Sequence, residues 1–568
     1  MAGIADSTVG QLSNLYVETL ANLHPCAATM MGIHAHDEEL TDWSPTGLTA
    51  RADLARKTIA ELDALGPDDI KTAAEQRAVD QMRSELQRSV ALHDAREDAR
   101  DLNILFSPGH FTRKCFDVMP RATAEDWQRI AIRLTQVPDC LHTHRMTLEE
   151  GRRTGEVGPR RQAVALADQF DVFGGRGGSD PYFATLAGQA PADLDEVSRR
   201  RLEEAAAKAT GAYAGLADYL RGTYATDADP TDGVGGDRYR LHAASVLDAD
   251  IDVEEAYDWA WRELARIDAE ATEAAGQILP GASLPEVHEH LQTVGPAHGD
   301  TDTFRAWAQG LQNEAIDRLH GTTFDIPEAI RHIEVVLAPA GSAAAPYYSP
   351  PSEDLSRPGR TWYPYEGRDH LPTWGEVTTA YHEGVPGHHL QLATLRLCTD
   401  ELTRYQVLAG GSSANAEGWA LYAERLMDEL GFVTDPAHRL GFLRAQALRA
   451  ARVVVDIGLH LGLTIPHDVT VEIGVAPGEK WTPDLAHAVL TRHWGPDDAF
   501  LSSEVDRYLG LPAQAIGYKL GERVWMDGRT AAQRTTGFDL LAWHTEVLGI
   551  GRVGLDQLAT ELAAIAAR

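Results

Sequence analysis

Two adjacent residues, His382 and Glu383, carry the clearest chemical signal in this sequence. The residues before them favour a buried helix. Thr373 and Glu376 have the spacing of a capping box, and apolar residues follow at helical intervals, at Trp374, Val377, Ala380 and Tyr381. A histidine next to a glutamate on such a helix is typical of a metal ligand beside a general base, as in the zinc peptidase motif H-E-x-x-H. We therefore expect the stretch 373–398 to carry the chemistry of the chain.

The second histidine of that motif is displaced along the chain. The motif places it four residues after the first, where this sequence has Pro386, and the next histidines are His388 and His389. In an ideal helix His388 lies about 120° from the face of His382, whereas His389 lies on that face but about 10.5 Å further along. Pro386 and Gly387 allow the helix to bulge, which would return His388 to the facing position. We predict His388 as the second ligand, with His389 as second choice; a kinked helix with ordinary hydrogen-bonded histidines is the alternative.

Two carboxylates on the next helical stretch are candidates for the same site. The run from Ser413 to about Gly431 begins with cap residues and continues as an apolar helix that carries Glu417 and Glu424 on one face. A carboxylate on an apolar face is costly unless it is paired or binds a metal. We predict Glu417 as the third metal ligand and Glu424 as a hydrogen-bond acceptor for a ligating histidine. Structural salt bridges are the alternative for both.

A later helix carries a ladder of charged residues. Arg449, Arg452, Asp456 and His460 recur at intervals of three and four residues. We expect Arg449 to be structural, and Arg452 or His460 to face the cleft and bind a carboxylate or an oxyanion. A second metal held by Asp456 and His460 fits the spacing but is the less favoured interpretation.

Two tyrosines follow on either side of Pro512. The phenol of Tyr518 is a neutral donor suited to the oxyanion of a tetrahedral intermediate, and we predict that role for it together with His460. Tyr508, like Arg452 and His389, is a predicted substrate contact. A tyrosine buried in the core is the alternative for Tyr518.

The elements that position these residues belong to a long, acidic chain. It has 568 residues, more than one compact core usually holds, so we expect two or three lobes. The formal net charge of −34 disfavours nucleic acid and anionic membranes as partners. Four scattered cysteines form no disulfide framework, the N-terminus lacks the pattern of a signal peptide, and no run is apolar enough to span a membrane. These features predict a cytoplasmic protein.

The pattern along the chain predicts a mainly α fold with a small β-sheet. Helical periodicity runs from residue 7 to about 224, and the Gly-, Pro- and Asp-rich stretch 227–237 is the best internal boundary. Residues 333–337 and 360–363 have the composition of short strands. We predict a helical lobe over 1–230 and a catalytic lobe over 231–568, with a small sheet within 330–365 and helices at the C-terminus. An edge of that sheet could pair with an extended substrate, or the strands could merely cover a helix.

Four sequence blocks make a specific resemblance. HEGVPGHHLQ, EGWALYAE, RVVVDIGLH and RYLGLPAQAIGYKLGE resemble the signature blocks of the bacterial domain-of-unknown-function 885 family, over roughly residues 10–560. That family is placed with zincin-like metallopeptidases of the Glu-zincin type. The resemblance implies a two-lobed helical protein with a deep central cleft, metal ligands at His382, His388 and Glu417, and Glu383 as the base. At Ala513 this chain departs from the PGQA usual in the last block.

Together these features predict a zinc-dependent hydrolase that cleaves a peptide or amide bond of a short peptide, with Glu383 as general base. A zinc hydrolase or lyase of a non-peptide small molecule is one alternative. A catalytically silent binding protein on the same fold is the other, although such a protein would have no need of Glu383. The expected partners are a small molecule or short peptide, without nucleic acid or membrane, and the oligomeric state stays open.

Overall fold

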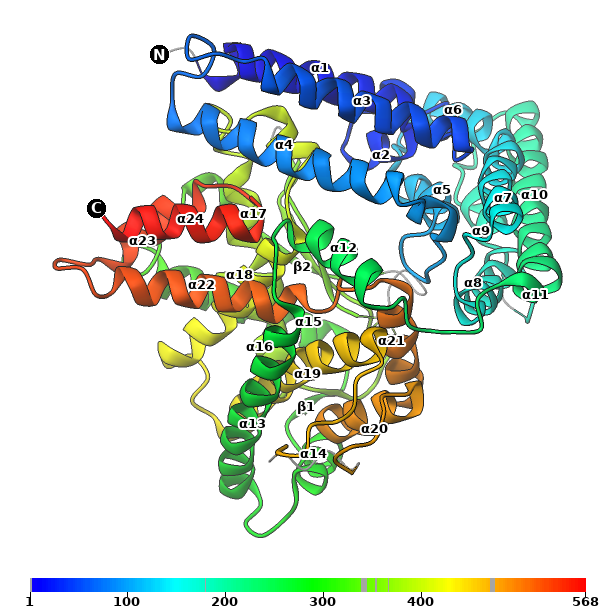
Figure 1. Cartoon of the computed structure of the whole chain (residues 1–568). Coiled ribbons are helices and arrows are strands. Elements are labelled where there is room, and N and C mark those ends of the chain that lie inside the picture. The colour runs from blue at the N-terminus through cyan, green and yellow to red at the C-terminus, as the bar shows by residue number, and fades with distance from the viewer. Residues whose placement is uncertain (1–2, 179, 339–344, 353–354, 366, 470–475) are drawn as a thin grey trace. The chain divides into compact units, whose positions relative to one another are not determined.

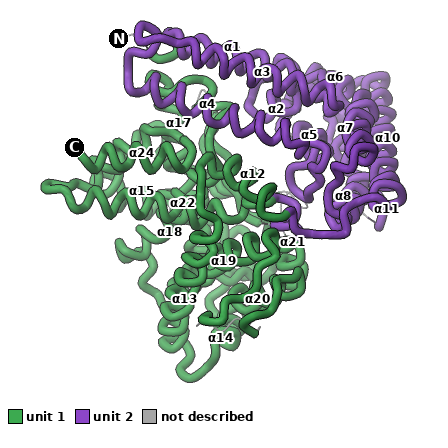
Figure 2. The backbone as a smooth tube through the Cα atoms, viewed as in Figure 1, with its two compact units in different colours: residues 1–5, 235–505, 512–568 green, residues 6–234, 506–511 purple. Residues whose placement is uncertain are grey.

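The chain is described from a computed structural model, which covers all residues except 1–2, 179, 339–344, 353–354, 366 and 470–475. The chain forms two compact units (Figure 2). Unit 1 comprises residues 1–5, 235–505 and 512–568, and unit 2 comprises residues 6–234 and 506–511. We predicted a division at residue 230, and the first segment of unit 2 ends at 234. The return of 506–511 to unit 2 was not anticipated.

Unit 2 is helical, and its longest helix, α10, forms the centre of one group of helices. The side chains of Leu202, Ala209, Tyr213 and Leu216 are buried, and α10 lies against α6, α7, α8 and α9 (Figure 1). Its start is fixed by Asp195, whose carboxylate accepts hydrogen bonds from two backbone N–H groups of the first turn. The helices of this unit are α1 (Thr8–Leu23), α2 (Pro25–Met30), α3 (Pro45–Asp63), α4 (Ala73–Asp94), α5 (Pro108–Val118), α6 (Ala124–Thr135), α7 (Val137–Thr154), α8 (Arg160–Phe173), α9 (Tyr182–Gly188), α10 (Glu196–Tyr219) and α11 (Ala225–Asp227).

Unit 1 combines helices with short strands. Its helices are α12 (Gly236–Leu247), α13 (Val253–Ile278), α14 (Leu284–Thr293), α15 (Thr301–Leu319), α16 (Glu376–Glu383), α17 (His388–Leu395), α18 (Ser413–Glu429), α19 (Pro436–Leu461), α20 (Pro483–Trp494), α21 (Asp498–Gly510, whose last residues belong to unit 2), α22 (Gly517–Ala532), α23 (Leu540–Leu548) and α24 (Leu555–Ala566). Its strands are β1 (Ala297–His298), β2 (Ile333–Leu337), β3 (Tyr347–Ser349), β4 (Gly359–Tyr363) and β5 (Leu371–Pro372). The predicted fold class, mainly α with a small β-sheet, is confirmed. Among the residues described, no helix combines the length and apolar composition needed to cross a membrane.

Three strands form the small sheet in the order β2-β4-β3. β2 pairs with β4 in parallel, and β3 pairs with β4 in antiparallel orientation. Gly359, Thr361 and Tyr363 are buried on one face of β4, as the alternation of a half-buried strand requires. Both predicted strands are present, and β3 was missed. Residues 339–344 and 353–354 of the predicted sheet region lie outside the described residues.

Two helix pairs hold the functional half of unit 1 together. α13 packs along α19, and α18 packs along α22. The second pair crosses at glycines: a Cβ on Gly418 would lie 2.3 Å from the carbonyl carbon of Gly521. A side chain at this position would therefore force the two helices apart. The residue next to Gly418 is Glu417, so this crossing sets where its carboxylate lies.

The start of α16 differs from the expectation. The residue that caps the helix is Gly375 rather than Thr373, and no side chain caps it. Glu376 does not reach back to form a capping box, because its carboxylate instead accepts a hydrogen bond from the hydroxyl of Tyr365 (2.7 Å). A tertiary partner thus replaces the local one that the spacing suggested.

Candidate metal centre

The two histidines of the candidate site lie on consecutive helices. α16 ends at Glu383, residues 384–387 form a turn that contains a cis Val385–Pro386 peptide bond, and α17 begins at His388. The helix therefore ends and restarts, where we had expected it to bulge. Gly387 is required in this turn, because a Cβ would lie 2.0 Å from the backbone oxygen of His382. The break returns His388 to the side of His382, with their ring centroids 4.8 Å apart.

Two buried side chains clamp this turn. The amide of Gln312 on α15 donates to the carbonyl oxygen of Ala380 (2.7 Å) and accepts from the backbone N–H of Val385 (2.9 Å). The indole N–H of Trp419 on α18 donates to the carbonyl oxygens of Pro386 (2.9 Å) and Gly387 (3.2 Å). The backbone that carries His382 and His388 is thus fixed from two helices.

Glu417 of α18 faces both histidines. Its Oε2 lies 3.4 Å from Nε2 of His382 and 3.6 Å from Nε2 of His388. Neither contact has hydrogen-bond geometry, and this buried oxygen has no hydrogen-bond partner among the residues described. One carboxylate oxygen thus faces a ring nitrogen of each histidine, and a cation between these groups could bind all three.

These distances fit a zinc ion. Zinc bound tetrahedrally to nitrogen and oxygen at 2.0–2.2 Å holds its ligand atoms about 3.3 Å apart, close to the separations found here. Two imidazoles and one carboxylate are also the donor set of a catalytic zinc with one open position. The residues predicted as ligands, His382, His388 and Glu417, thus lie together.

Glu424 orients His382 from the opposite side. Its Oε1 lies 2.7 Å from Nδ1 of His382, and its Oε2 accepts from the hydroxyl of Thr378 (2.5 Å). A proton held on Nδ1 by this bond leaves the Nε2 lone pair directed toward Glu417. Burial alone would lower the pKa of His382, but without a cation in the site the carboxylates of Glu417 and Glu424 outweigh it and raise that pKa to about 9. A bound cation would take the place of the proton on Nε2. Glu424 thus has the position that we predicted for it.

Glu383 lies beside this cluster and is almost completely buried. One carboxylate oxygen lies within 4.8 Å of a ring nitrogen of both His382 and His388. Glu417 is nearer to those nitrogens, so it is the better third ligand and Glu383 the better base. Burial raises the pKa of Glu383, and the neighbouring imidazoles act against that shift. A carboxylate that is basic and adjacent to the ligands suits proton transfer.

The structure commits His389 to other partners. Its Nδ1 lies 2.9 Å from the hydroxyl of Tyr348 in β3, and its Nε2 lies 2.7 Å from the carbonyl oxygen of Ile330. Both ring nitrogens are therefore engaged, and the side chain is buried. Contrary to the expectation, His389 is free neither to bind metal nor to contact a substrate. It joins α17 to the sheet.

Arg452 and His460 are also held by neighbours. Arg452 donates to Oε2 of Glu504 from Nε (3.0 Å) and from Nη2 (2.6 Å), and its guanidinium lies 4.9 Å from the ring centroid of Tyr518. His460 is buried with Nε2 3.8 Å from Asp456, beside the ring of Tyr239. The structure thus places Arg452 in a buried ion pair and His460 in the core, where we had expected cleft-facing residues.

The two candidate tyrosines fall in different units. Tyr518 is half-buried in the first turn of α22, on the stretch that crosses α18 beside Glu417. Tyr508 belongs to segment 506–511, which is part of unit 2, and its side chain is fully buried. Of the two, only Tyr518 is placed in the unit that holds the histidines.

Two residues that support the site were not predicted: Gln312 fixes the turn, and Thr378 donates to Glu424. Arg449, which we had expected to be structural, lies with Nη2 3.7 Å from Oε1 of Glu424. Thr378 precedes His382 by one helical turn, which is a signal that could have been noticed. Gln312 and Arg449 lie on distant helices, and no spacing connects them to the motif.

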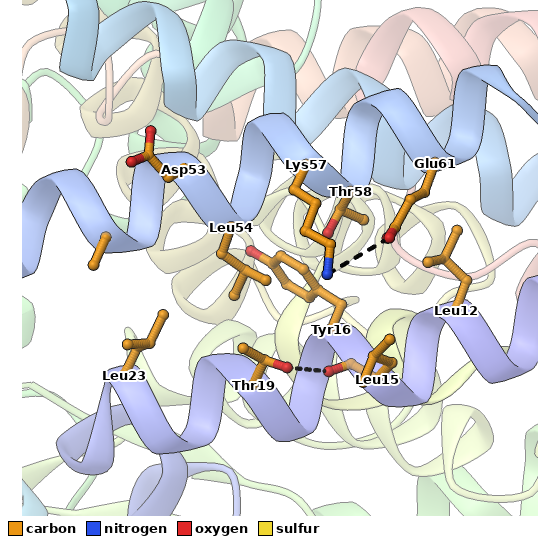
Figure 3. A pocket seen from close by; sticks show the side chains of 11 residues that line it. Leu12, Leu15, Tyr16, Thr19, Leu23, Asp53, Leu54, Lys57, Thr58 and Glu61 are labelled. Carbon is orange, nitrogen blue, oxygen red and sulfur yellow. Dashed lines mark hydrogen bonds and ion pairs between the residues drawn. The ribbon is translucent and has the colours of Figure 1, made fainter.

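A pocket in unit 2 offers no comparable chemistry. It has a volume of about 290 Å³, lies between α1 and α3, and is lined by four leucines among eleven residues (Figure 3). Its charged groups have ion-pair partners: Lys57 lies 3.7 Å from Glu61, and Asp53 lies 2.7 Å from Arg56. It has no histidine or cysteine in its lining, so the candidate site remains the cluster in unit 1.

Comparison with known proteins gives a family but no activity. The model of the family described as "Bacterial protein of unknown function (DUF885)" matches residues 25–562, and the chain belongs to this family. Among curated proteins there is no match. A candidate lipoprotein from Colwellia psychrerythraea has the same fold, with a TM-score of 0.83 and 21% identity over 99% of both chains. A candidate lipoprotein of unknown function from Shewanella oneidensis gives a TM-score of 0.73 and 18% identity, over 98% of this chain and 100% of that one.

Proposed function

We propose that this protein is a zinc-dependent hydrolase of the zincin-like type that cleaves the peptide or amide bond of a short peptide. The observation that carries the proposal is the convergence of Glu417 Oε2 on Nε2 of His382 and of His388, at 3.4 and 3.6 Å. Glu383 next to the first ligand supplies the base that a binding protein would not need.

Each residue of the cluster has a task in this proposal. Zinc, when bound, lowers the pKa of a water molecule and polarises a carbonyl group. Glu383 accepts the proton of the attacking water and passes it to the leaving nitrogen. Glu424 keeps the proton of His382 on Nδ1, so that Nε2 remains a ligand. Tyr518 is our candidate donor to the oxyanion, because α22 crosses α18 beside Glu417.

The sheet suggests how an extended substrate would lie. β3 is an edge strand, and its residue Tyr348 contacts His389, the second residue of α17. This edge is therefore close to the helix that begins with His388. A peptide that added to β3 would gain backbone hydrogen bonds and pass beside the site. A short peptide is for this reason favoured over a compact small molecule.

The location of the protein stays a prediction. The sequence favours the cytoplasm, whereas the proteins of the same fold are described as candidate lipoproteins. At their level of identity the likeness extends to the fold alone.

Metal analysis tests the proposed ligands directly. We expect about one zinc per chain in the wild type, and loss of the ion in His382→Ala and Glu417→Ala. His389→Ala is the matched control, because both of its ring nitrogens are bonded within the protein. Full zinc occupancy in the two ligand variants would contradict the site.

A second measurement separates enzyme from binding protein. Glu383→Gln preserves shape but cannot accept a proton, so turnover of a cleavable short peptide should fall by about 10²–10⁴, or about 3–5 kcal/mol in barrier. Zinc content should stay near the wild-type value, because Glu383 is not a ligand. Undiminished turnover of the zinc-loaded variant would show that Glu383 is not the general base.

A further inference from the structure

Two arginines on α19, less than one turn apart, have opposite environments. Arg452 is held by two hydrogen bonds to Glu504. Among the residues described, Arg449 faces one carboxylate oxygen, Oε1 of Glu424, and its Nη2 lies 3.7 Å from that atom, beyond hydrogen-bond distance. The buried Nε of Arg449 has no partner among the residues described. A guanidinium with five donors in a largely enclosed place normally finds acceptors.

Glu424 does not need Arg449 to complete its hydrogen bonds. Its two oxygens already bond Nδ1 of His382 (2.7 Å) and the hydroxyl of Thr378 (2.5 Å). The side chain of Arg449 is 16% exposed, so part of the group is accessible to solvent. The donors of Arg449 are therefore available to something other than the protein.

The position of Arg449 relates it to the proposed chemistry. A carboxylate and an imidazole, those of Glu424 and His382, separate its Nη2 from the point where the three ligand atoms converge. That span is on the order of one to two residues of extended chain, at about 3.3–3.6 Å each. The guanidinium of Arg449 faces the carboxylate that orients His382. It thus lies near the reacting groups without being part of the ligand set.

We propose that Arg449 binds a carboxylate of the substrate, so that the preferred substrates are short peptides with a free C-terminal carboxylate one or two residues beyond the cleaved bond. A guanidinium pairs with a carboxylate through two parallel charge-assisted hydrogen bonds, a geometry that fixes register as well as sign. The inference rests on the proposed hydrolytic function and specifies its substrate class. It assigns Arg449 the role that spacing alone had given to Arg452.

The first test compares the tripeptide Ala-Ala-Ala with its C-terminal amide. We expect the zinc-loaded wild type to prefer the free acid by about 10- to 100-fold in kcat/KM, the range of a charged hydrogen-bonded contact. In Arg449→Gln, kcat/KM should fall for the free acid but not for the amide, so that the preference is lost, and zinc content should stay unchanged. Arg449→Lys, which retains charge but not the planar fork, should fall between them.

Arg439→Gln is the matched control. It removes the same charge from the same helix, but Arg439 is paired with Glu270 and Asp428, at 3.6 and 3.5 Å. We expect its preference for the acid to equal that of the wild type. An equal loss on both peptides in Arg449→Gln, or a loss of zinc, would make Arg449 a mere support for Glu424 and overturn the inference.

A binding measurement keeps the inference separate from the proposed function. Calorimetric titration with N-acetyl-L-alanine and with its amide requires no turnover. Selective binding of the acid by the wild type and Arg439→Gln but not by Arg449→Gln upholds the inference, even if no peptide is cleaved and the hydrolase proposal fails. Wild-type protein that binds both probes equally, or neither, overturns it.

Discussion

Arg133 in unit 2 and Glu417 in unit 1 are both charged and largely removed from water, but their surroundings differ. Arg133 is fully buried and donates from Nε to the carbonyl oxygen of Glu39 (2.9 Å), from Nη1 to the hydroxyl of Thr29 (2.8 Å) and from Nη2 to the carbonyl oxygen of Pro25 (3.1 Å). Each nitrogen of the guanidinium has a partner, and the side chain joins α6 to the chain around α2.

The cluster in unit 1 lacks this completeness. Oε2 of Glu417, Nδ1 of His388 and Nε of Arg449 are buried without hydrogen-bond partners among the residues described. Buried polar atoms are nearly always satisfied, so a group of unsatisfied ones around a His-Glu motif indicates a ligand site. Burial of charge alone does not separate a structural residue from a functional one. In this pair of residues the hydrogen bonds differ: the three nitrogens of Arg133 all donate, and the oxygen of Glu417 that faces the histidines has no partner among the residues described.

The largest expected effect is the loss of stability that follows when Arg133, whose hydrogen bonds are complete, is replaced. Arg133→Leu would leave two carbonyl acceptors without their donor and would remove the cation that lies 3.7 Å from Asp37. Loss of one member of a buried pair typically costs about 3–5 kcal/mol in free energy of unfolding. Hydrogen exchange of the amides in α6 and α10 should report this loss for unit 2, while zinc content stays unchanged.

Arg129→Leu is the control for that prediction. Arg129 precedes Arg133 by one turn of α6 and pairs with Glu125 on the surface, at 2.6 Å with the arginine 39% exposed. The change should alter stability by no more than about 0.5 kcal/mol. Similar losses in the two variants would show that hydrogen-bond completeness is not what makes Arg133 important.

A smaller effect, on zinc affinity, is expected from Glu424, whose two oxygens are hydrogen-bonded and which orients the proposed ligand His382. Glu424→Gln keeps the size of the side chain but removes the charge that holds the proton of His382 on Nδ1. Loss of such a supporting carboxylate typically lowers metal affinity by about 10- to 100-fold. Competition with a chromophoric zinc chelator measures it. Asp428→Asn, a change on the same helix away from the histidines, should leave zinc affinity unchanged. An unchanged zinc affinity in Glu424→Gln would show that Glu424 does not support the metal site.

The smallest effect concerns a buried histidine of unit 2 and depends on pH. Burial, with smaller contributions from Lys114 and Arg113, lowers the pKa of His110 from 6.5 to about 3. The unfolded chain therefore takes up a proton more readily, and stability falls as the pH drops below 6.5 toward 3. Between pH 8 and 5.5 this residue should cost about 1.4 kcal/mol.

His110→Gln isolates this contribution. It cannot titrate, so the loss of stability between pH 8 and 5.5, measured by urea denaturation, should be about 1.4 kcal/mol smaller than in the wild type. His110 bonds Ser107 and Gln169, which glutamine can partly replace. A pH dependence equal to that of the wild type would mean that His110 is charged in the folded protein or that other groups dominate.

Local patterns predicted the elements but not the contacts between them. The strand at 333–337 and the helix from Ser413 to Glu429 appear where composition and capping residues placed them. β3 was missed because three residues between prolines carry too little pattern to identify a strand. The capping box at Thr373 failed because Tyr365, from a preceding segment, competes for Glu376.

The site divides in the same way. His382, His388 and Glu417 could be proposed because motif spacing and a later apolar helix limit the choices. The different environments of Arg449 and Arg452 could not be predicted. The two residues share a helix and a charge, and they differ in that Arg452 is bonded to Glu504. The contacts of His389 with Tyr348 and Ile330 favour His388 over His389 as the predicted ligand, and both partners are far from the histidines in the sequence.

Segment 506–511 has a consequence for how the protein is made and divided. It belongs to unit 2, where the backbone oxygen of Asp506 accepts from the amide of Gln162 (2.7 Å) and its carboxylate pairs with Arg161 (3.3 Å). During translation the first 234 residues leave the ribosome long before this segment exists. Unit 2 therefore cannot be completed until most of unit 1 has been synthesised. A gene fragment that stops at residue 234 encodes an incomplete unit, and a permuted gene that appends 506–511 to it would encode the whole.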